Sequence, residues 1–260
     1  NENKLTTGIG LNFETLNRTY FAEKAMLKSQ FVFFQYDYNP NYKWNILAGL
    51  RYDNTNQYQS QFSPKLAVNF KINTRLSLKT SIGYGFKAPD FRQLYFDFLN
   101  SSVGYAVLGY NVAESELNLL EGQGQLLYRI PGISFENPLK PESSINFNFG
   151  SYYQKEQLKI EANLFYNSIS NLIDTRVVAQ KTNGQNVFSY FNINQIFTYG
   201  LEFNSTYFFS KQITIAVGYQ YLIAKDKSIV EAIENETVYA RDPFTLESFQ
   251  IKKADYFGLL

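Results

Sequence analysis

The sequence predicts an all-β fold, a section of an antiparallel transmembrane β-barrel, and three observations lead to this prediction. Apolar and polar residues alternate along long runs, of which Leu158 to Tyr166 is the clearest. Aromatic residues make up 18% of the chain, with 24 Phe and 21 Tyr. Some links between the runs are very short and others are long. Since successive side chains on a strand point to opposite faces, each run has an apolar and a polar face, as in a barrel with lipid outside and water inside.

Turn residues divide the chain into about ten alternating segments. Several links are very short, among them Asn39-Pro40-Asn41, Asn73-Thr74, Lys155-Glu156-Gln157 and Lys211-Gln212. Because Asn and Pro tolerate the backbone angles of tight turns, these links indicate strands joined at one end of the barrel. The predicted strands are residues 5–14, 30–38, 43–53, 62–72, 75–87, 142–154, 158–170, 186–194, 197–210 and 213–225.

The remaining links are long. Residues 88–141 form a loop of about fifty residues, where connections of about 4–6 residues are usual. Residues 171–185 and the tail from residue 226 onward are shorter versions. Outer-membrane barrels have short periplasmic turns and longer extracellular loops. We therefore predict that residues 88–141 are a long extracellular loop within the barrel section.

Part of this loop has a helical pattern. Residues Glu114 to Leu127 could form a short amphipathic helix with Leu117, Leu120 and Leu127 on one side. The loop also carries aromatic residues and Arg, which are common in binding loops. Packing within the loop and contact with a ligand are equal alternatives for these side chains.

Composition excludes several classes of function. The net charge is +1, from 24 basic and 23 acidic residues, with no concentrated basic patch of the kind that binds nucleic acid. The chain has no Cys and no His, which excludes disulfides, thiolate catalysis and Ser-His-Asp chemistry within these residues. No nucleophile–base pair, paired carboxylates or phosphate-binding loop stands out. We therefore predict a protein that is not an enzyme and has no metal site and no resident cofactor.

Three short stretches are more specific. The first, Tyr84 to Tyr95, contains Phe86-Lys87-Ala88-Pro89. The second is Asn137-Pro138-Leu139-Lys140-Pro141-Glu142, and the third runs from Leu164-Phe165-Tyr166-Asn167 to Tyr199-Gly200-Leu201-Glu202. In this order and spacing they resemble the barrel of TonB-dependent outer-membrane receptors. Within the large loop, Tyr105 to Tyr110 looks most like receptors from Bacteroidetes-type bacteria.

The resemblance implies a place in the outer membrane and a role in transport. Residues 1–260 would be an internal or late section of a receptor barrel of about 22 strands. The plug domain and TonB box of the family are absent from these residues, so the TonB complex would act through that absent plug region. The ligand would be a scarce nutrient: a ferric siderophore, haem, cobalamin, or a glycan or peptide. Haem receptors often carry a His between the first two motifs, and there is none here.

Further partners follow from the same resemblance. Outer-membrane lipid and lipopolysaccharide would surround the barrel, a surface lipoprotein is a further candidate partner, and no nucleic acid is expected. Ligand contacts are expected from the loop. The residues predicted to bind the ligand are Arg92, Tyr95, Tyr105, Tyr110 and Arg129.

The two proline motifs have a structural interpretation. Pro has no N–H for the strand ladder, so Phe86, Lys87, Ala88 and Pro89 are expected to end a strand. Proline also stiffens the return of the chain into the sheet. The motif residues of this return are Asn137, Pro138, Lys140, Pro141 and Glu142. A functional alternative is that Lys140 and Glu142 pair with groups near the ligand.

Other functions share the same alternation. A passive porin-like barrel would show it without the ordered receptor motifs. A soluble all-β binding module would place the apolar faces in a core, and an outer-membrane enzyme would need a catalytic cluster. Strand length, aromatic content and loop asymmetry favour the membrane interpretation.

Overall fold

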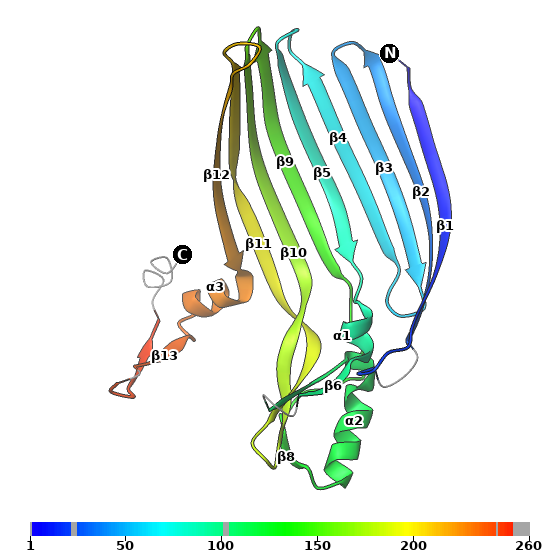
Figure 1. Cartoon of the computed structure of the whole chain (residues 1–260), viewed down its shortest axis with the longest axis vertical. Helices are drawn as coiled ribbons and strands as arrows, with labels where there is room; N and C mark the ends of the chain where they lie inside the picture. The colour runs from blue at the N-terminus through cyan, green and yellow to red at the C-terminus, as the bar shows by residue number, and fades with distance from the viewer. Residues whose placement is uncertain (1, 22–24, 101–103, 243, 252–260) are drawn as a thin grey trace.

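The chain forms one large curved sheet with a small folded unit at one end (Figure 1). The computed structural model describes residues 2–21, 25–100, 104–242 and 244–251. Within these ranges no helix is both long and apolar enough to span a membrane. The prediction of an all-β antiparallel barrel section is confirmed, since nine long strands follow one another as antiparallel neighbours. They are β1 (Lys4–Leu16), β2 (Ala25–Asn41), β3 (Trp44–Thr55), β4 (Gln61–Lys71), β5 (Leu76–Lys87), β9 (Glu142–Lys155), β10 (Leu158–Lys181), β11 (Asn186–Phe208) and β12 (Thr214–Asp226).

Strand pairing keeps the two faces of the sheet distinct. In the register across β3, β4, β5, β9, β10, β11 and β12, residues that lie opposite one another share a face. One row is polar and the next is mainly apolar, which is the alternation expected of a wall between water and lipid. The polar row is Asn45, Asn69, Lys79, Gly150, Asn163, Glu202 and Gln220, and the adjacent row is Ile46, Val68, Thr80, Phe149, Leu164, Leu201 and Tyr221.

The polar face is the hollow one. A cavity of about 620 Å³ lies against it, lined by polar side chains that include Asn69, Lys79, Glu161 and Asn163. On the opposite face large apolar side chains are exposed, and Leu164 retains 51% of its surface. A soluble sandwich would bury such side chains in a core, so the apolar face of this sheet is the one suited to lipid.

Aromatic pairs mark both ends of the apolar face. Near the short turns the rings of Trp44 and Phe70 lie 4.3 Å apart. Toward the opposite end the rings of Tyr52 and Phe62 lie 4.7 Å apart. These positions match the two aromatic girdles that flank the hydrocarbon region in outer-membrane barrels.

Three of the predicted boundaries are wrong. Residues 171–185 are not a loop, because β10 continues to Lys181 and joins β11 through a tight turn at residues 182–185. The predicted strands 186–194 and 197–210 are one strand, β11. The predicted turn Asn39-Pro40-Asn41 lies within β2, which turns at Tyr42 and Lys43 instead. Polar residues and a bulge interrupt the alternation in β10 and β11, and this interruption reads as a loop in the sequence.

The long strands β10 and β11 project beyond the rest of the sheet (Figure 1). Two irregularities mark the point of departure, one between Ile169 and Leu172 and the next between Leu172 and Ile173. Asn171 lies between the first pair with a φ of +57°, a left-handed conformation that Asn tolerates better than most residues. A matched pair of bulges therefore bends this hairpin away from the wall.

Residues 88–141 leave the sheet after β5 and return to its neighbour β9. They contain α1 (Phe91–Tyr95), β6 (Asp97–Asn100), β7 (Tyr105–Leu108), α2 (Tyr110–Gly122) and β8 (Leu126–Arg129). Strand β7 pairs with β11, and β8 pairs with β10. These five elements and the projecting ends of β10 and β11 are called the loop head below.

The loop head has its own apolar core. One cluster gathers α2 and β7 on the projecting hairpin, and its fully buried members include Leu117, Val178 and Val187. The helix predicted from Glu114 to Leu127 is instead Tyr110–Gly122. Leu117 and Leu120 are buried as expected, whereas Leu127 lies on β8 and is 61% exposed. Helix α2 ends at Gly122, and Gly124 follows with a positive φ, so the helix stops before Leu127.

The tail predicted as a loop from residue 226 contains a helix and a small hairpin. Asp226 caps α3 (Lys227–Glu234) by accepting hydrogen bonds from the backbone N–H of Ser228 and Ile229. Strands β13 (Tyr239–Arg241) and β14 (Ser248–Gln250) then pair with each other. Local capping chemistry therefore orders a segment whose charged composition resembles solvated loop.

Replacing Leu164 by Arg tests which face meets lipid. A charged Arg near the middle of the apolar face costs about 2–4 kcal/mol in a bilayer. We expect Leu164→Arg to lower the free energy of unfolding of the full-length receptor in lipid vesicles by that amount, measured by denaturant titration. The neighbouring Asn163→Arg, on the polar face, should have a small effect. Equal destabilisation by both changes would contradict the assignment of faces.

Candidate functional site

The first proline motif ends β5 and starts a helix. Pro89 is fully buried and cannot extend the ladder beyond Lys87. Asp90 then caps α1: its Oδ1 accepts a hydrogen bond of 2.7 Å from the Gln93 backbone N–H, and the Gln93 Oε1 accepts one of 3.0 Å from the Asp90 N–H. This reciprocal capping box fixes the exit of the chain into the loop head.

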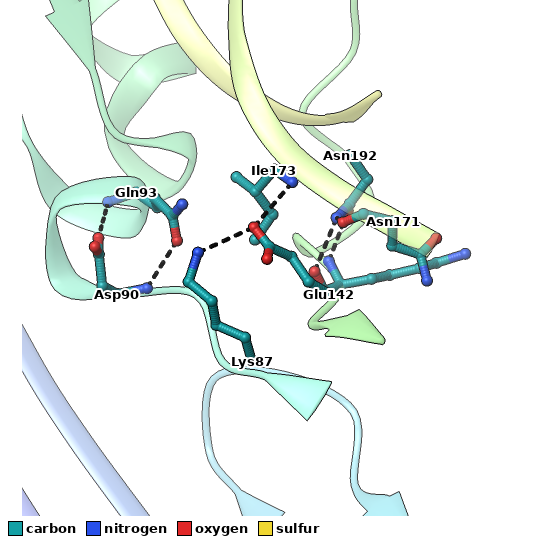
Figure 2. A network of polar contacts seen from close by, with 8 residues as sticks. Lys87, Asp90, Gln93, Glu142, Asn171, Ile173 and Asn192 are labelled. Carbon is teal, nitrogen blue, oxygen red and sulfur yellow. Dashed lines mark hydrogen bonds and ion pairs between the residues drawn. The ribbon is translucent and has the colours of Figure 1, made fainter. Parts of the chain in front are cut away.

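The two proline motifs meet through a buried carboxylate. Glu142, at the start of β9, is only 8% exposed. Its Oε1 accepts hydrogen bonds from the Lys87 ammonium at 3.1 Å and from the Ile173 backbone N–H at 3.2 Å (Figure 2). One side chain thus joins the end of β5, the start of β9 and the bent part of β10.

Asn192 holds the adjoining segment. Its Nδ2 donates to the backbone carbonyls of Asn171 and Lys140, at 2.7 and 2.9 Å. Its Oδ1 accepts a hydrogen bond of 2.8 Å from the Lys140 N–H. We call Lys87, Lys140, Glu142, Asn171, Ile173 and Asn192 the rim junction, since they connect the wall to the loop head (Figure 2).

The rim junction assigns a structural role to both proline motifs. Glu142 and Lys140 are bonded to other parts of the protein, and Asn137 accepts a hydrogen bond at its carbonyl from the Tyr110 hydroxyl. The expected termination and re-entry of strands are both present. Whether Lys140 and Glu142 also contact a ligand stays a prediction.

Two predicted ligand residues lie together on α1. Arg92 is exposed and makes no ion pair with any residue in the described ranges. The hydroxyl of Tyr95 donates a 2.7 Å hydrogen bond to Gln57 Oε1 in the β3–β4 turn. Burial raises the pKa of Tyr190, and the positive charge of Arg92 opposes this shift, so Arg92 lies near the projecting end of β11. Arg92 is therefore an exposed cation beside the projecting hairpin, and its predicted ligand contact stays a prediction.

Tyr105 and Tyr110 have different surroundings. Tyr105 is half-buried on β7, with ring centres 6.1 Å from Phe98 and 6.4 Å from Phe188. Tyr110 is 7% exposed at the start of α2, packs against Phe135 and Phe191, and burial raises its pKa. Tyr110 is thus part of the packing of the loop head.

Arg129 lies at the far side of α2. Its guanidinium pairs with Glu114 at 3.1 Å and Glu121 at 2.7 Å, and donates to Asn118 Oδ1 at 2.7 Å. Three side chains of α2 thus hold the Arg129 side chain, which extends from β8, in place. The structure does not bring Arg129 together with Arg92 and Tyr95, and its predicted ligand contact stays a prediction.

Some residues of this region escape the sequence analysis. Gln57 accepts a hydrogen bond from Tyr95, and Asn192 binds two backbone segments. Each stands among other Asn and Gln residues, so nothing in the sequence singles it out. The capping box is different, because Asp90 followed three residues later by Gln93 is a readable signal. Within the described residues no group of three or more His, Cys, Asp or Glu is placed to hold a metal ion.

Two partly buried carboxylates lie in the loop head, Asp97 on β6 and Glu116 on α2. Burial raises the pKa of Asp97, and burial together with the charge of Asp97 raises the pKa of Glu116. Ionisation of these partly buried carboxylates therefore opposes the packing of the loop head.

Comparison with known proteins identifies the family. The family profile described as TonB dependent receptor-like, beta-barrel matches residues 4–256. The chain belongs to this family. It is accordingly a section of an outer-membrane β-barrel, and the family prediction made from the sequence is confirmed.

Individual relatives match part of the chain. A probable TonB-dependent siderophore receptor PirA of Acinetobacter baumannii is 28% identical over 129 residues, which is 50% of this chain and 15% of that protein. The ferric enterobactin receptor of Pseudomonas aeruginosa is 28% identical over 130 residues, again 50% of this chain and 15% of that protein. Each match therefore spans less than a fifth of the relative's length.

The fold has solved counterparts. The crystal structure of the siderophore receptor PirA from Pseudomonas aeruginosa aligns with a TM-score of 0.66 at 18% identity. The alignment covers 86% of this chain and 37% of that receptor. The shared wall of strands agrees with the architecture described above.

Substitutions at Glu142 separate its charge from its role as an acceptor. Glu142→Ala leaves the buried Ile173 N–H without a partner, which costs about 1–3 kcal/mol. Glu142→Gln retains an acceptor oxygen and should cost less, because the Lys87 ammonium is exposed. We expect faster hydrogen exchange in β10 near Ile173 for the Ala variant, measured on the full-length receptor in detergent. The exposed Glu136→Ala is the control, and equal exchange in all three variants would contradict the proposed junction.

The carboxylate pair predicts a pH dependence of the loop head. Because the folded pKa of Asp97 and Glu116 is raised, their contribution to stability is fully present below the ordinary carboxyl pKa and is lost as pH rises through the raised values. We expect slower proteolysis of α2 at about pH 4, close to the ordinary carboxyl pKa, than at about pH 7.5. Asp97→Asn should reduce this difference, and an unchanged difference in that variant would contradict the role of Asp97 in it. A protease whose activity is calibrated at both pH values controls for the enzyme.

Proposed function

We propose that the chain forms the wall and part of the extracellular mouth of a receptor that takes up a ferric siderophore. The observation that carries this proposal is the family match over residues 4–256, together with two relatives that are named as siderophore or ferric enterobactin receptors. Residues 88–141, within the loop head, would lie on the extracellular side, and the hollow polar face would line the transport path.

The energy for uptake would come from the TonB complex. In this proposal that complex acts through a plug domain outside the residues described here. Outer-membrane lipid and lipopolysaccharide would surround the apolar face, and a surface lipoprotein could cap the loop head. The chain itself would bind and guide the ligand and carry no enzymatic activity.

The geometry supports separate structural and ligand-binding roles for residues at the extracellular mouth. The rim junction fixes the loop head to the wall, while the exposed Arg92 on the capped helix α1 is held in a defined position. A cation presented on a fixed helix can pair with the anionic groups of an iron chelate. Tyr95, bonded to Gln57, would help to hold α1 in place rather than supply charge.

Uptake of radioactive iron tests the proposal. A strain that lacks the receptor gene should lose uptake of ferric enterobactin or a related ferric siderophore under iron limitation, and the full-length gene should restore it. Arg92→Gln should weaken ligand affinity about tenfold, since a charge-assisted contact contributes about 1.5–3 kcal/mol. Arg241→Gln, on β13, is a matched control. Undiminished uptake of every siderophore tested in the deletion strain would refute the assignment.

A further inference from the structure

The positive charge of the hollow face is concentrated on two neighbouring strands. Residues 54–89, which include β4 and β5, contain five Lys or Arg residues and no Asp or Glu, although the net charge of the whole chain is only +1. The four that lie on strands share the face of Asn69 in the strand register, and the fifth, in the turn between the strands, lines a cavity on that face. We call these five residues the basic row: Lys65 and Lys71 on β4, Arg75 in the turn, and Lys79 and Lys87 on β5.

The basic row follows the length of the wall. Lys65 lies opposite Gly83, so Lys87, Lys65 and Lys79 occupy levels that are four residues apart along β5. At a rise of about 3.3 Å per residue, each step is about 13 Å. The other two cations continue the row to the short turn, and the opposite end of β5 leads into α1, which carries Arg92 (Figure 1). The row therefore connects the mouth with the short-turn end of the wall.

Two cavities lie along the basic row. Lys79 lines the cavity of about 620 Å³ described above, and Lys71 and Arg75 line a second one of about 560 Å³ at the short-turn end. Tyr152 lines both, so the two cavities adjoin on the wall, and the Lys79 ammonium lies 5.6 Å from the centre of its ring. Between its cations β5 presents only Gly and Ser to the hollow side, which leaves this stretch of the wall open.

Most of this charge has no carboxylate partner. Among the residues that the structure describes, Lys87 is the one member of the row in an ion pair, with Glu142, and the other four side chains are exposed. Two carboxylates border the cavities, Glu161 on β10 and Glu156 in the turn before it, and neither pairs with the row. Unpaired cations that line a cleft raise the local concentration of anions.

We propose that the basic row is the path along which the cargo moves from the mouth toward the short-turn end, and that this cargo is an iron chelate of net negative charge. The inference rests on the proposed function in siderophore uptake and adds to it the charge class of the siderophore. Charge complementarity selects an anion, because a cationic chelate would be repelled at every step of the row. Each cation is exposed to solvent, so it holds an anion weakly enough to release it to the next.

Uptake of radioactive iron by cells that produce the full-length receptor tests the inference. The probes are two anionic chelates, ferric enterobactin and ferric citrate, and one cationic chelate, ferrioxamine B. We expect uptake of an anionic chelate to depend on the receptor gene, and the triple variant Lys65→Gln, Lys71→Gln, Lys79→Gln to lower its maximal rate about tenfold. The Kd for the chelate at the cell surface should stay unchanged, because the row lies below the mouth.

A second triple variant removes the same charge elsewhere and serves as the matched control. It combines Lys4→Gln and Lys159→Gln on the hollow face with Lys211→Gln in a short turn. We expect this variant to take up iron at the native rate. An equal loss in both triple variants, or a native rate in the first, would overturn the proposal, as would gene-dependent uptake of ferrioxamine B alone. Failure of the proposed function gives a different result, since uptake of every chelate would then persist in the deletion strain.

The sign of the charge at one position separates a path from a structural contact. Lys79→Arg should retain the native uptake rate, Lys79→Gln should lower it, and Lys79→Glu should lower it further. Equal rates in the three variants would contradict the path. Heat-modifiable migration on a gel measures the temperature at which each variant unfolds, and this temperature should be the same in all of them. A lower unfolding temperature that accompanies the slower uptake would show that the row pairs with an acidic part of the plug domain, and would also overturn the proposal.

Discussion

The structure depends on closing every backbone hydrogen bond of the wall within the sheet. A strand whose apolar side chains face lipid has no water with which to pair its N–H and C=O groups, and each unpaired group costs several kcal/mol. Continuous antiparallel pairing along β1, β2, β3, β4, β5, β9, β10, β11 and β12 meets this demand for the inner strands. The same requirement accounts for the short turns, the alternating rows and the aromatic pairs at both ends. Each is compatible with continuous strand pairing, with apolar side chains toward lipid and polar side chains toward water.

Beyond the membrane region a different requirement applies. The loop head is wetted outside, so it is stabilised as a small globular unit, with Leu117, Val178 and Val187 packed in a conventional core. The rim junction lies where the lipid-facing wall meets the loop head. Glu142 serves there because a carboxylate oxygen can accept from a side chain and from a backbone N–H that the bent strand leaves without a partner. A polar connection of this kind suits the boundary, since neither lipid nor a dry core would tolerate it.

The sequence predicts the strands well wherever one face of the sheet meets lipid and the other meets water. Leu158 to Tyr166 alternates because lipid and water lie on its two sides, and β10 follows as predicted. The alternation is lost beyond Ile169, where Asp174, Thr175 and Arg176 are all exposed, and this stretch therefore reads as a loop in the sequence. Arg129 shows the limit for single residues. Its charge suggests a ligand contact, but its partners on α2 become visible only when the helix is docked against β8.

The pair of irregularities in β10 and β11 limits how this hairpin can change in length. Ile169 lies opposite Ile196, the pairing shifts at Leu172 with Asn194, and Ile173 opposite Asn192 restores the original register. An insertion on one strand alone would move every later pair by one position and exchange the two faces beyond it. Val178 and Val187 would then leave the core. Length changes between receptors of this shape should therefore occur in matched pairs here, or nearer the tip, where the shift between Val177 and Ala179 already has no counterpart on β11.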